Sequence, residues 1–377
     1  MRLADLETPA LIADRARIEA NAKRMRDRLA ARGVALRPHL KTTKSAAIAH
    51  IAHGGVTGPG TVSTLREADY FLQHGFDDLT YAVCITPNKF AHAASLVERG
   101  ARLKLLLADA GTAQALADFA CDRGVKLAAM IEIDCGDHRT GLVPHDAALL
   151  DCARVLDSAD SVDFAGLLTH GSQSYACRTK ADIVAVADEE RQALLDAQAR
   201  LAETGIAVDA LSAGSTPTAA LGERFDGITE MRPGVYLAGD LFQWQLGTCD
   251  FDDIAVSVLA SVIACDRRGN RVVLDAGGLA LSKDRSTAEA AVDYGYGLVV
   301  REDGSRFGVD AIVTGVSQEH GVVSSDAQLP FDELPVGARV RVLPNHVCMT
   351  AASYQRYYVV DDGDTTVVDE WHKASGW

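Results

Sequence analysis

The sequence predicts an α/β protein in which a (β/α)₈ barrel is followed by an antiparallel β domain. Two observations support this prediction. From about residue 14 to residue 245, short apolar β-prone runs alternate with longer amphipathic stretches, which is typical of repeated β/α units around a parallel sheet. Beyond about residue 250, short β-prone runs follow one another between Gly, Asp and Pro turns, as expected for antiparallel strands.

Eight strands are expected in the first part of the chain, with helix-like segments between them. Residues 14–31 and 180–203 give the longest helical patterns, and the first of these carries apolar residues at every third or fourth position. Eight such units in about 230 residues match a barrel whose active site lies at the carboxyl ends of its strands. The expected strands are residues 33–38, 58–63, 78–83, 103–108, 126–133, 162–168, 207–212 and 227–232.

The second part of the chain contains no long helical pattern. We expect the barrel to occupy residues 14–245, and the β domain to combine residues 1–13 with residues 246–377. The strands expected in the β domain are residues 254–265, 271–274, 309–316, 339–343, 356–360 and 365–369.

Charge and composition limit the function classes. The 377 residues carry a formal net charge of −15, from 37 Lys and Arg against 52 Asp and Glu, which disfavours non-specific binding to nucleic acid or to an anionic membrane. No run approaches the roughly 20 apolar residues of a membrane span, and the amino terminus lacks the apolar core of a signal peptide. The eight cysteines form no C-x-x-C pair. We therefore expect a cytoplasmic protein with a small-molecule partner.

A lysine ends the first expected strand. Residues 37–44 read Arg-Pro-His-Leu-Lys-Thr-Thr-Lys, which places Lys41 at the carboxyl end of that strand. There, desolvation can lower the pKa of a lysine and make its amine a nucleophile for Schiff-base chemistry. A solvated loop lysine is the alternative, and it is the commoner role for any single lysine.

Small residues follow the seventh expected strand. The run 213–218 reads Ala-Gly-Ser-Thr-Pro-Thr, in which Gly214, Ser215 and Thr216 would let backbone N–H groups and hydroxyls approach an anionic phosphate. Barrels often bind phosphate at this late position. Turn formation and helix capping remain the alternative.

A histidine and a cysteine are spaced two residues apart near the carboxyl end of the chain. In a strand, His346 and Cys348 would point to the same face. Imidazole and thiolate suit Zn²⁺ and accept other transition ions. A bare His-x-Cys pair is more often structural, and it lacks the third protein ligand of most catalytic zinc sites.

These segments resemble those of the D-threonine aldolase and eukaryotic-type D-serine dehydratase family, which is related to alanine racemase through the fold-type III barrel. The resemblance implies that Lys41 holds pyridoxal 5′-phosphate. The run 134–141 (Asp-Cys-Gly-Asp-His-Arg-Thr-Gly) is similar to a family loop whose arginine approaches the phenolate oxygen of the cofactor, a role that passes to Arg139. Pairing of Arg139 with a neighbouring aspartate is the alternative. His170 would stack on the pyridine ring, or would be a buried histidine bonded to the backbone.

The resemblance also implies a phosphate site and a metal site. Gly214, Ser215 and Thr216, with Gly234 and Tyr236 on the next loop, would surround the cofactor phosphate. The run 344–350 resembles the family's Pro-x-His-x-Cys or Pro-x-His-x-Asp motif, which implies that the pair in this chain holds Mn²⁺ or Zn²⁺, with Mg²⁺ as a further option. Its cysteine is closer to the dehydratase pattern, because some bacterial aldolases have aspartate at that position.

The expected function is a lyase that cleaves β-hydroxy-D-amino acids of the D-threonine type to glycine and an aldehyde. His320 is a candidate base for the β-hydroxyl, and the preference rests on the compact chain, which resembles bacterial aldolases. D-serine dehydration to pyruvate and ammonia is the first alternative. A carrier of pyridoxal phosphate without turnover and an amino-acid racemase are further alternatives. A homodimer is expected from the family.

Overall fold

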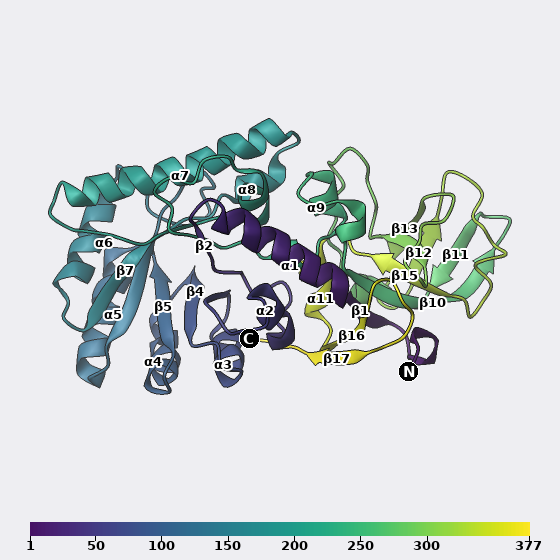
Figure 1. Ribbon diagram of the computed structural model, residues 1–377, viewed down its shortest axis with the longest axis horizontal. Helices are drawn as coiled ribbons and strands as arrows, with labels where there is room; N and C mark the ends of the chain where they lie inside the picture. Colours follow the sequence, from purple (N-terminus) through teal and green to yellow (C-terminus); the bar gives the residue numbers. More distant parts are fainter. The chain divides into compact units, whose positions relative to one another are not determined.

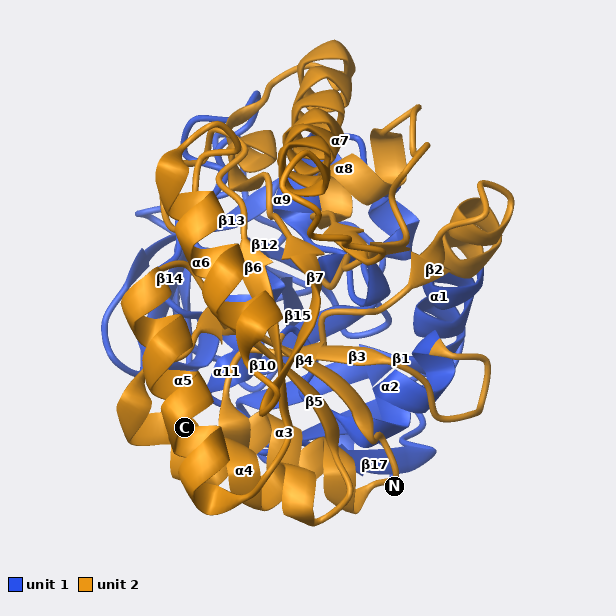
Figure 2. Ribbon diagram, turned by 90° about the vertical axis from the view of Figure 1, so that its left-hand side faces the viewer, with its two compact units in different colours: residues 1–23, 42–52, 235–375 blue, residues 24–41, 53–234, 376–377 orange.

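The computed structural model describes residues 1–377 and divides into two compact units. Unit 1 contains residues 1–23, 42–52 and 235–375, and unit 2 contains residues 24–41, 53–234 and 376–377; they are blue and orange in Figure 2. Helix α1 (Arg15–Ala30) begins in unit 1 and ends in unit 2. Lys41 and Thr42 are neighbours in the chain but belong to different units.

Unit 2 contains the predicted barrel of parallel strands, which is confirmed. Its eight strands pair in the order β2-β9-β8-β7-β6-β5-β4-β3, and every pair is parallel. An isolated parallel bridge between His39 and Thr61 joins the two ends of this order. The strands are β2 (Ala35–Leu36), β3 (Gly60–Val62), β4 (Asp78–Cys84), β5 (Arg102–Leu107), β6 (Leu127–Glu132), β7 (Val162–Leu168), β8 (Leu211–Ala213) and β9 (Glu230–Met231).

The helices of unit 2 begin at capping residues that the sequence supplies. Thr64, Asp109, Asp146 and Thr179 each accept a backbone N–H of the first turn that follows, which satisfies a donor that the helix leaves free. The helices, labelled in Figure 1, are α3 (Leu65–Gln73), α4 (Phe90–Glu98), α5 (Ala110–Arg123), α6 (Ala147–Ser158), α7 (Lys180–Ala202) and α8 (Thr216–Leu221). No helix of the chain combines the length and the apolar character needed to cross a membrane.

Unit 1 contains the predicted antiparallel β domain. Strands β10, β11, β14, β13, β12 and β15 pair in a closed ring, because β10 bonds both β15 and β11, and all six pairings are antiparallel. Strand β1 continues the sheet from β10 and is followed by β16 and β17. The strands are β1 (Ala10–Asp14), β10 (Val256–Asp266), β11 (Arg271–Leu274), β12 (Leu298–Arg301), β13 (Ala311–Val316), β14 (Gly321–Ser324), β15 (Arg339–Leu343), β16 (Arg356–Val360) and β17 (Asp369–His372).

Only short helices occur in unit 1 besides the start of α1. They are α2 (Ala46–Ala52), α9 (Leu241–Gln245), α10 (Gly278–Leu281) and α11 (Val347–Ala352). Short 3₁₀ turns complete the chain at Leu3–Asp5, Pro87–Lys89, Ser172–Ala176, Val235–Leu237 and Phe251–Asp253.

The prediction of the β domain missed three strands and misplaced one. Strands β1, β12 and β14 have only four or five residues each, so their identity depends on the strands beside them more than on a local pattern. The last strand covers Asp369–His372 rather than residues 365–369, because Arg356 to Val359 pair with this later segment.

A buried arginine joins strands at the seam of the barrel in unit 2. The side chain of Arg37 is 4% exposed. Its Nε is 2.7 Å from Oε2 of Glu230, and one terminal nitrogen is 2.7 Å from Oδ1 of Asp78. Ser212 donates to the other oxygen of Glu230 over 2.7 Å. The arginine therefore links the end of β2 to β9 and β4.

Arg37→Ala is expected to destabilise the protein by about 3 kcal/mol, because it removes the nearest cationic partner of two largely buried carboxylates. The urea midpoint of unfolding measures the loss. Arg154→Ala is the matched control, since the Arg154 side chain is 59% exposed, and its ion pair with Asp151 is worth less than about 1 kcal/mol. Equal midpoints for the two variants would contradict a structural role for the buried network.

Candidate active site

One pocket of unit 2 collects polar residues that follow the barrel strands, at the end where barrel enzymes place their chemistry. Three of its cationic or titratable groups, Lys41, Arg139 and His170, were predicted from the sequence, as was Gly214. The complete lining consists of His39, Lys41, Ala82, Glu132, Arg139, Leu168, His170, Gly214 and Arg232.

Lys41 lies in a turn beyond the first barrel strand. Strand β2 already ends at Leu36, and the backbone then bonds across the seam, with Leu40 N–H donating to Thr61 O over 2.8 Å and His39 N–H donating to Pro233 O over 2.8 Å. The Lys41 side chain is exposed. The expectation that the strand itself would bury this lysine is therefore wrong, because the strand is shorter than its apolar pattern suggests.

Two histidines of the pocket are kept neutral by their surroundings. Burial first, and then the positive charges of Lys41, Arg232 and Arg139, lower the pKa of His170 to about 3. Burial and the charge of Lys41 also hold the pKa of His39 well below its usual value. The Nδ1 of His170 donates to Gly214 O over 3.3 Å, so its Nε2 is left as an acceptor.

Two arginines of the pocket are held differently. Arg232 is 4% exposed, and it donates to Ser212 Oγ over 2.6 Å and to Thr169 O over 2.5 Å. Burial lowers its pKa to about 10, so it remains charged at neutral pH. The Arg139 side chain is 55% exposed, and its Nε lies 3.6 Å from Oδ2 of Asp137. This loose pair leaves the Arg139 guanidinium available on the pocket wall.

The segment 214–216 forms a tight approach between two loops. Gly214 has φ +106°, and a Cβ there would lie 2.9 Å from Cε of Met231, so only glycine fits. Ser215 caps α8 by accepting from Thr218 N–H over 3.2 Å. Thr216 Oγ1 accepts from Gly234 N–H over 3.2 Å. The capping alternative is thus realised for Ser215, and the Thr216 hydroxyl joins the two predicted phosphate loops.

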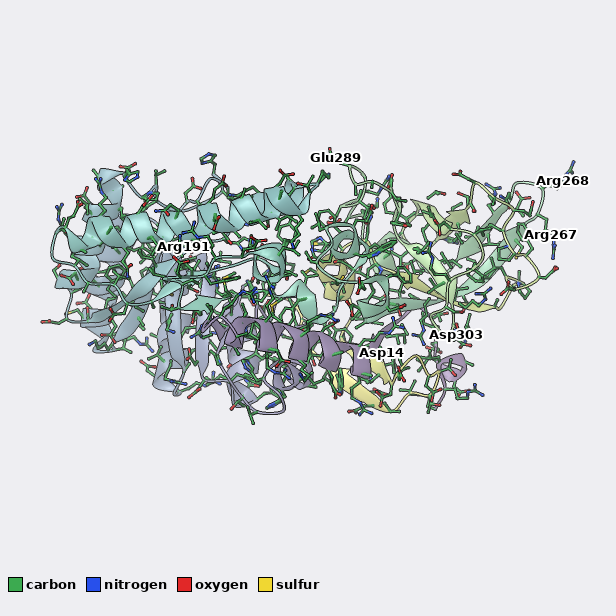
Figure 3. The ribbon with its side chains drawn as sticks, turned by 45° about the horizontal axis from the view of Figure 1, so that its top comes forward. Asp14, Arg191, Arg267, Arg268, Glu289 and Asp303 are labelled. Atoms are coloured by element: carbon green, nitrogen blue, oxygen red, sulfur yellow. The ribbon has the colours of Figure 1, made fainter.

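A carboxylate of α7 holds the loops that carry His170 and Gly214. Oε1 of Glu190 accepts from Gly171 N–H over 2.5 Å and from Gly214 N–H over 3.3 Å, and Glu190 is 1% exposed. Burial raises its pKa. The next residue, Arg191, labelled in Figure 3, turns to Asp226 and donates to its backbone oxygen over 2.8 Å. One turn of α7 therefore fixes three loops of unit 2.

The His-x-Cys pair of unit 1 does not lie in a strand. Strand β15 ends at Leu343, and His346 is the residue before α11. The prediction that strand alternation aligns His346 and Cys348 is wrong, because Pro344 and Asn345 follow the strand end and the chain then turns into a helix. The two side chains are nevertheless hydrogen-bonded to each other. Oδ2 of Asp284 is 3.0 Å from Nδ1 of His346.

The partners of this pair are also found in unit 1. The Cys348 Sγ is 3.2 Å from Oγ1 of Thr42, the residue that follows Lys41 in the chain. Burial alone would lower the pKa of His346, but the hydrogen bonds to Asp284 and Cys348 raise it to about 11. No group of three or more His, Cys, Asp or Glu side chains is arranged to hold a metal ion.

Two further residues of unit 1, His320 and Tyr236, were predicted to belong to the site. His320 is exposed in the turn between β13 and β14. Tyr236 is 7% exposed in a 3₁₀ turn. A racemase could use the hydroxyl of Tyr354, Tyr357 or Tyr358 as its second base. Two of these hydroxyls are occupied, since Tyr354 donates to Ala280 O over 3.0 Å and Tyr357 donates to Thr43 O over 2.9 Å.

Four residues of the site were missed from the sequence. His39 and Arg232 stand in the runs that resembled the family, and His39 is two positions before Lys41, on the same side of an extended chain. Glu132 was detectable as the one charged residue at the end of an apolar strand. Glu190 gave no signal, because it stands in a run of charged helical residues that is typical of a solvated face.

The pocket residues fit pyridoxal phosphate. His39 Nδ1 is buried in this pocket without a hydrogen-bond partner, which is unusual for a buried polar atom in a protein and is explained by a polar ligand. The pair in unit 1 fits a divalent ion by its donor chemistry, with imidazole and sulfur supplying two ligands.

Two family models match the chain. The alanine racemase N-terminal domain matches residues 13–241, and a serine dehydratase domain matches residues 255–360. A parallel barrel with a lysine-bearing pocket and a following six-stranded antiparallel barrel define a fold-type III pyridoxal-phosphate protein with the alanine racemase-like fold.

The chain belongs to the family of D-serine dehydratases, D-threo-3-hydroxyaspartate dehydratase and D-threonine aldolase. It is 38% identical to the D-threo-3-hydroxyaspartate dehydratase of Delftia sp. (strain HT23), with 100% of this chain and 99% of that protein aligned. Identity to the D-serine dehydratase of Dictyostelium discoideum is 30%, covering 99% and 98%. Identity to the D-threonine aldolase of Arthrobacter sp is also 30%, covering 98% and 92%. These relatives are lyases.

The solved structure of the Delftia enzyme is similar along the whole chain. It superposes with a TM-score of 0.95 at 37% identity and covers 100% of both chains. Solved variants of that enzyme replace a histidine, or the cysteine two positions later, by alanine, and the cysteine variant is described as metal-free.

The neutral state of His170 predicts a pH dependence for the cofactor-free protein. Its folded pKa of about 3 lies below the unfolded value of about 6.5, so the unfolded chain binds more protons between these values. Stability is therefore lost as pH falls from 6.5, by about 1.4 kcal/mol per unit. His170→Asn keeps a donor for Gly214 O without this titration. Between pH 7 and pH 5, wild type should lose about 2 kcal/mol more than the variant, measured by urea unfolding. Parallel pH profiles would contradict the neutral assignment.

Proposed function

We propose that this protein is a lyase that removes the β-hydroxyl of a β-hydroxy-D-amino acid, giving a keto acid and ammonia, with pyridoxal phosphate and a divalent ion as cofactors. The observation that carries the proposal is the pocket that brings Lys41, Arg139, His170 and Gly214 together at the carboxyl ends of the barrel strands. Family membership supports the chemistry.

Eight residues predicted from the sequence would hold pyridoxal phosphate. Lys41 would hold its aldehyde carbon, Arg139 its phenolate oxygen, and His170 would lie against its ring. Gly214, Ser215, Thr216, Gly234 and Tyr236 would surround its phosphate. When bound, this cofactor accepts electrons from a broken bond at the substrate Cα.

In the proposed reaction, the Lys41 amine removes the proton from Cα of the substrate. The guanidinium of Arg232 is fixed by Ser212 and Thr169 and keeps a positive charge in the pocket. His170 and His39 stay neutral beside Lys41, so they add no further cation next to its amine.

His346 and Cys348 would hold the divalent ion, as Zn²⁺ or Mn²⁺, with its remaining positions open for water and substrate. Such an ion polarises a bound oxygen and so assists departure of the β-hydroxyl. The similar Delftia enzyme, whose cysteine variant is described as metal-free, supports the same assignment.

Aldol cleavage of a D-threonine-type substrate to glycine and an aldehyde is the second candidate. It is favoured by 30% identity to a D-threonine aldolase along 98% of this chain, and it would use the same cofactors. We prefer dehydration because His320, the candidate base for the aldol route, is exposed in a turn, and because the identity to a dehydratase is higher.

The racemase and carrier alternatives receive less support. A racemase would need a tyrosine hydroxyl as a second base, and Tyr354 and Tyr357 already donate to backbone oxygens. A carrier would leave the His346 and Cys348 pair without a role. We also expect a homodimer, in which the pair serves the cofactor of its own subunit or that of the partner.

Lys41→Ala should abolish covalent retention of pyridoxal phosphate. The yellow imine absorbance of wild type, and the cofactor adduct found by mass spectrometry after borohydride reduction, should both disappear. Lys44→Ala is the matched control, because Lys44 lies three residues later in the same turn region and outside the pocket; it should retain both signals. Loss of the adduct in Lys44→Ala, with retention in Lys41→Ala, would show that Lys44 holds the cofactor and would contradict the proposal.

The reaction itself is tested with purified protein, pyridoxal phosphate and Mn²⁺, offered D-threonine, D-serine or D-threo-3-hydroxyaspartate. Keto acids and ammonia are the expected products, resolved by mass. Chelation of the ion should slow the reaction at least about 100-fold, since Lewis-acid stabilisation of charge is worth several kcal/mol. Glycine with an aldehyde would replace dehydration by aldol cleavage, and undiminished rates after chelation would remove the ion from the mechanism.

A further inference from the structure

Asp284 contacts His346, the histidine of the candidate metal pair, at ring nitrogen Nδ1. Its Oδ2 lies 3.0 Å from Nδ1 of His346. A carboxylate can only accept, so Nδ1 carries the proton of this bond, and Nε2, the other ring nitrogen, is the one that remains to bind an ion. Histidine ligands in metalloproteins commonly donate their other N–H to such a carboxylate.

The loop of Asp284 is itself fixed by several bonds. Oδ1 of Asp284 accepts from Ser286 N–H over 2.8 Å and from the Ser286 hydroxyl. Its backbone oxygen accepts from Nδ2 of Asn345 over 3.3 Å, and the same Nδ2 donates to Gly295 O over 2.5 Å. Asn345 is 2% exposed and precedes His346 in the chain. The carboxylate and the histidine therefore belong to one hydrogen-bonded frame within unit 1.

A strained residue stands at the start of this loop. Ser282 has φ 69° and ψ 172°, a region that is nearly restricted to glycine and that costs about 1–3 kcal/mol for other residues. Its Oγ accepts from Asp284 N–H over 3.2 Å. Such a conformation persists only where the surrounding structure determines it. The bonds of this loop therefore hold Asp284 in place despite the backbone strain at Ser282.

A second carboxylate fixes the backbone between the two candidate ligands. Oδ2 of Asp240 accepts from Val347 N–H over 3.0 Å, and Oδ1 accepts from Gln243 N–H over 2.7 Å. Asp240 is completely buried. Because Val347 lies between His346 and Cys348, this bond sets the distance between their side chains independently of Asp284.

We infer that Asp284 is a positioning residue for the divalent ion: it fixes the tautomer and the ring orientation of His346 so that Nε2 and the Cys348 sulfur can bind one ion together. This role rests on the proposed function, since it requires that the pair binds an ion. Asp284 acts through His346 and contributes no ligand of its own.

The test measures Mn²⁺ affinity of the pyridoxal-phosphate-loaded protein by equilibrium dialysis, without substrate. Asp284→Ala should weaken binding by about 10–100-fold, the usual effect of removing such a partner. Asp332→Asn is the matched control, because Asp332 is 96% exposed in the same unit and pairs only with Arg267; its affinity should equal that of wild type. Cofactor absorbance and melting temperature should stay unchanged in Asp284→Ala.

Two further variants separate positioning from general damage. Asp284→Glu restores a carboxylate and should recover part of the lost affinity, whereas Asp284→Asn should not recover it fully. If Asp284→Ala does not fold, Ser286→Ala loosens the carboxylate without removing it and should weaken Mn²⁺ binding several-fold. With Co²⁺ in place of Mn²⁺, the visible spectrum of Asp284→Ala should lose the features that wild type owes to its histidine ligand, as His346→Ala does.

The outcomes distinguish this inference from the proposed function. Wild-type affinity in Asp284→Ala and in Ser286→Ala would overturn the positioning role while leaving the metal-dependent lyase in place. Absence of Mn²⁺, Zn²⁺ and Co²⁺ binding by wild type, with affinities equal to those of His346→Ala, would overturn both. Weaker binding in the Asp284 variants, with no recovery in Asp284→Glu and no saturation at higher Mn²⁺, would make Asp284 a determinant of folding and would overturn the positioning role.

Discussion

Closure of the parallel barrel at its shortest strand is the constraint on which the candidate site depends. Strand β2 pairs with β9 through only two residues, and no strand ladder joins it to β3. The bridge between His39 and Thr61 and the ion pairs of Arg37 complete the ring instead. The chain leaves the barrel directly after these contacts. The contacts at the seam therefore determine the position of the turn that contains Lys41.

The electrostatics of the pocket follow from that closure. Lys41, Arg139 and Arg232 bring three cationic groups to one small space, although the whole chain carries a net charge of −15. The two histidines stay neutral because they are desolvated beside these cations. A pocket of this kind favours a ligand with anionic groups at more than one position, as a phosphate and a phenolate on one ring would supply.

The sequence allowed the fold to be predicted more completely than the site. All eight barrel strands were expected from alternating apolar and amphipathic runs, since that pattern reflects which side is buried. The short strands β12 and β14 were missed, because pairing with neighbours defines them. Within the site, Lys41 and Gly214 stood in recognisable motifs, whereas Glu190 did not. Burial of one acidic residue among several on α7 depends on loops far away in the sequence, and no local pattern encodes it.

The backbone on both sides of Lys41 is fixed by hydrogen bonds. On its amino-terminal side, the seam of the barrel holds His39 and Leu40. On its carboxyl-terminal side, unit 1 holds the chain through Thr42 and Cys348, through Tyr357 and Thr43, and through Ala374 and Lys44. Lys41 is thus the flexible side chain of a backbone that is fixed on both sides. The proposed function asks the Lys41 amine to hold a cofactor and then to move a proton at Cα. This combination suits that task, because the backbone sets the reach of the amine while its four-carbon stem supplies the motion.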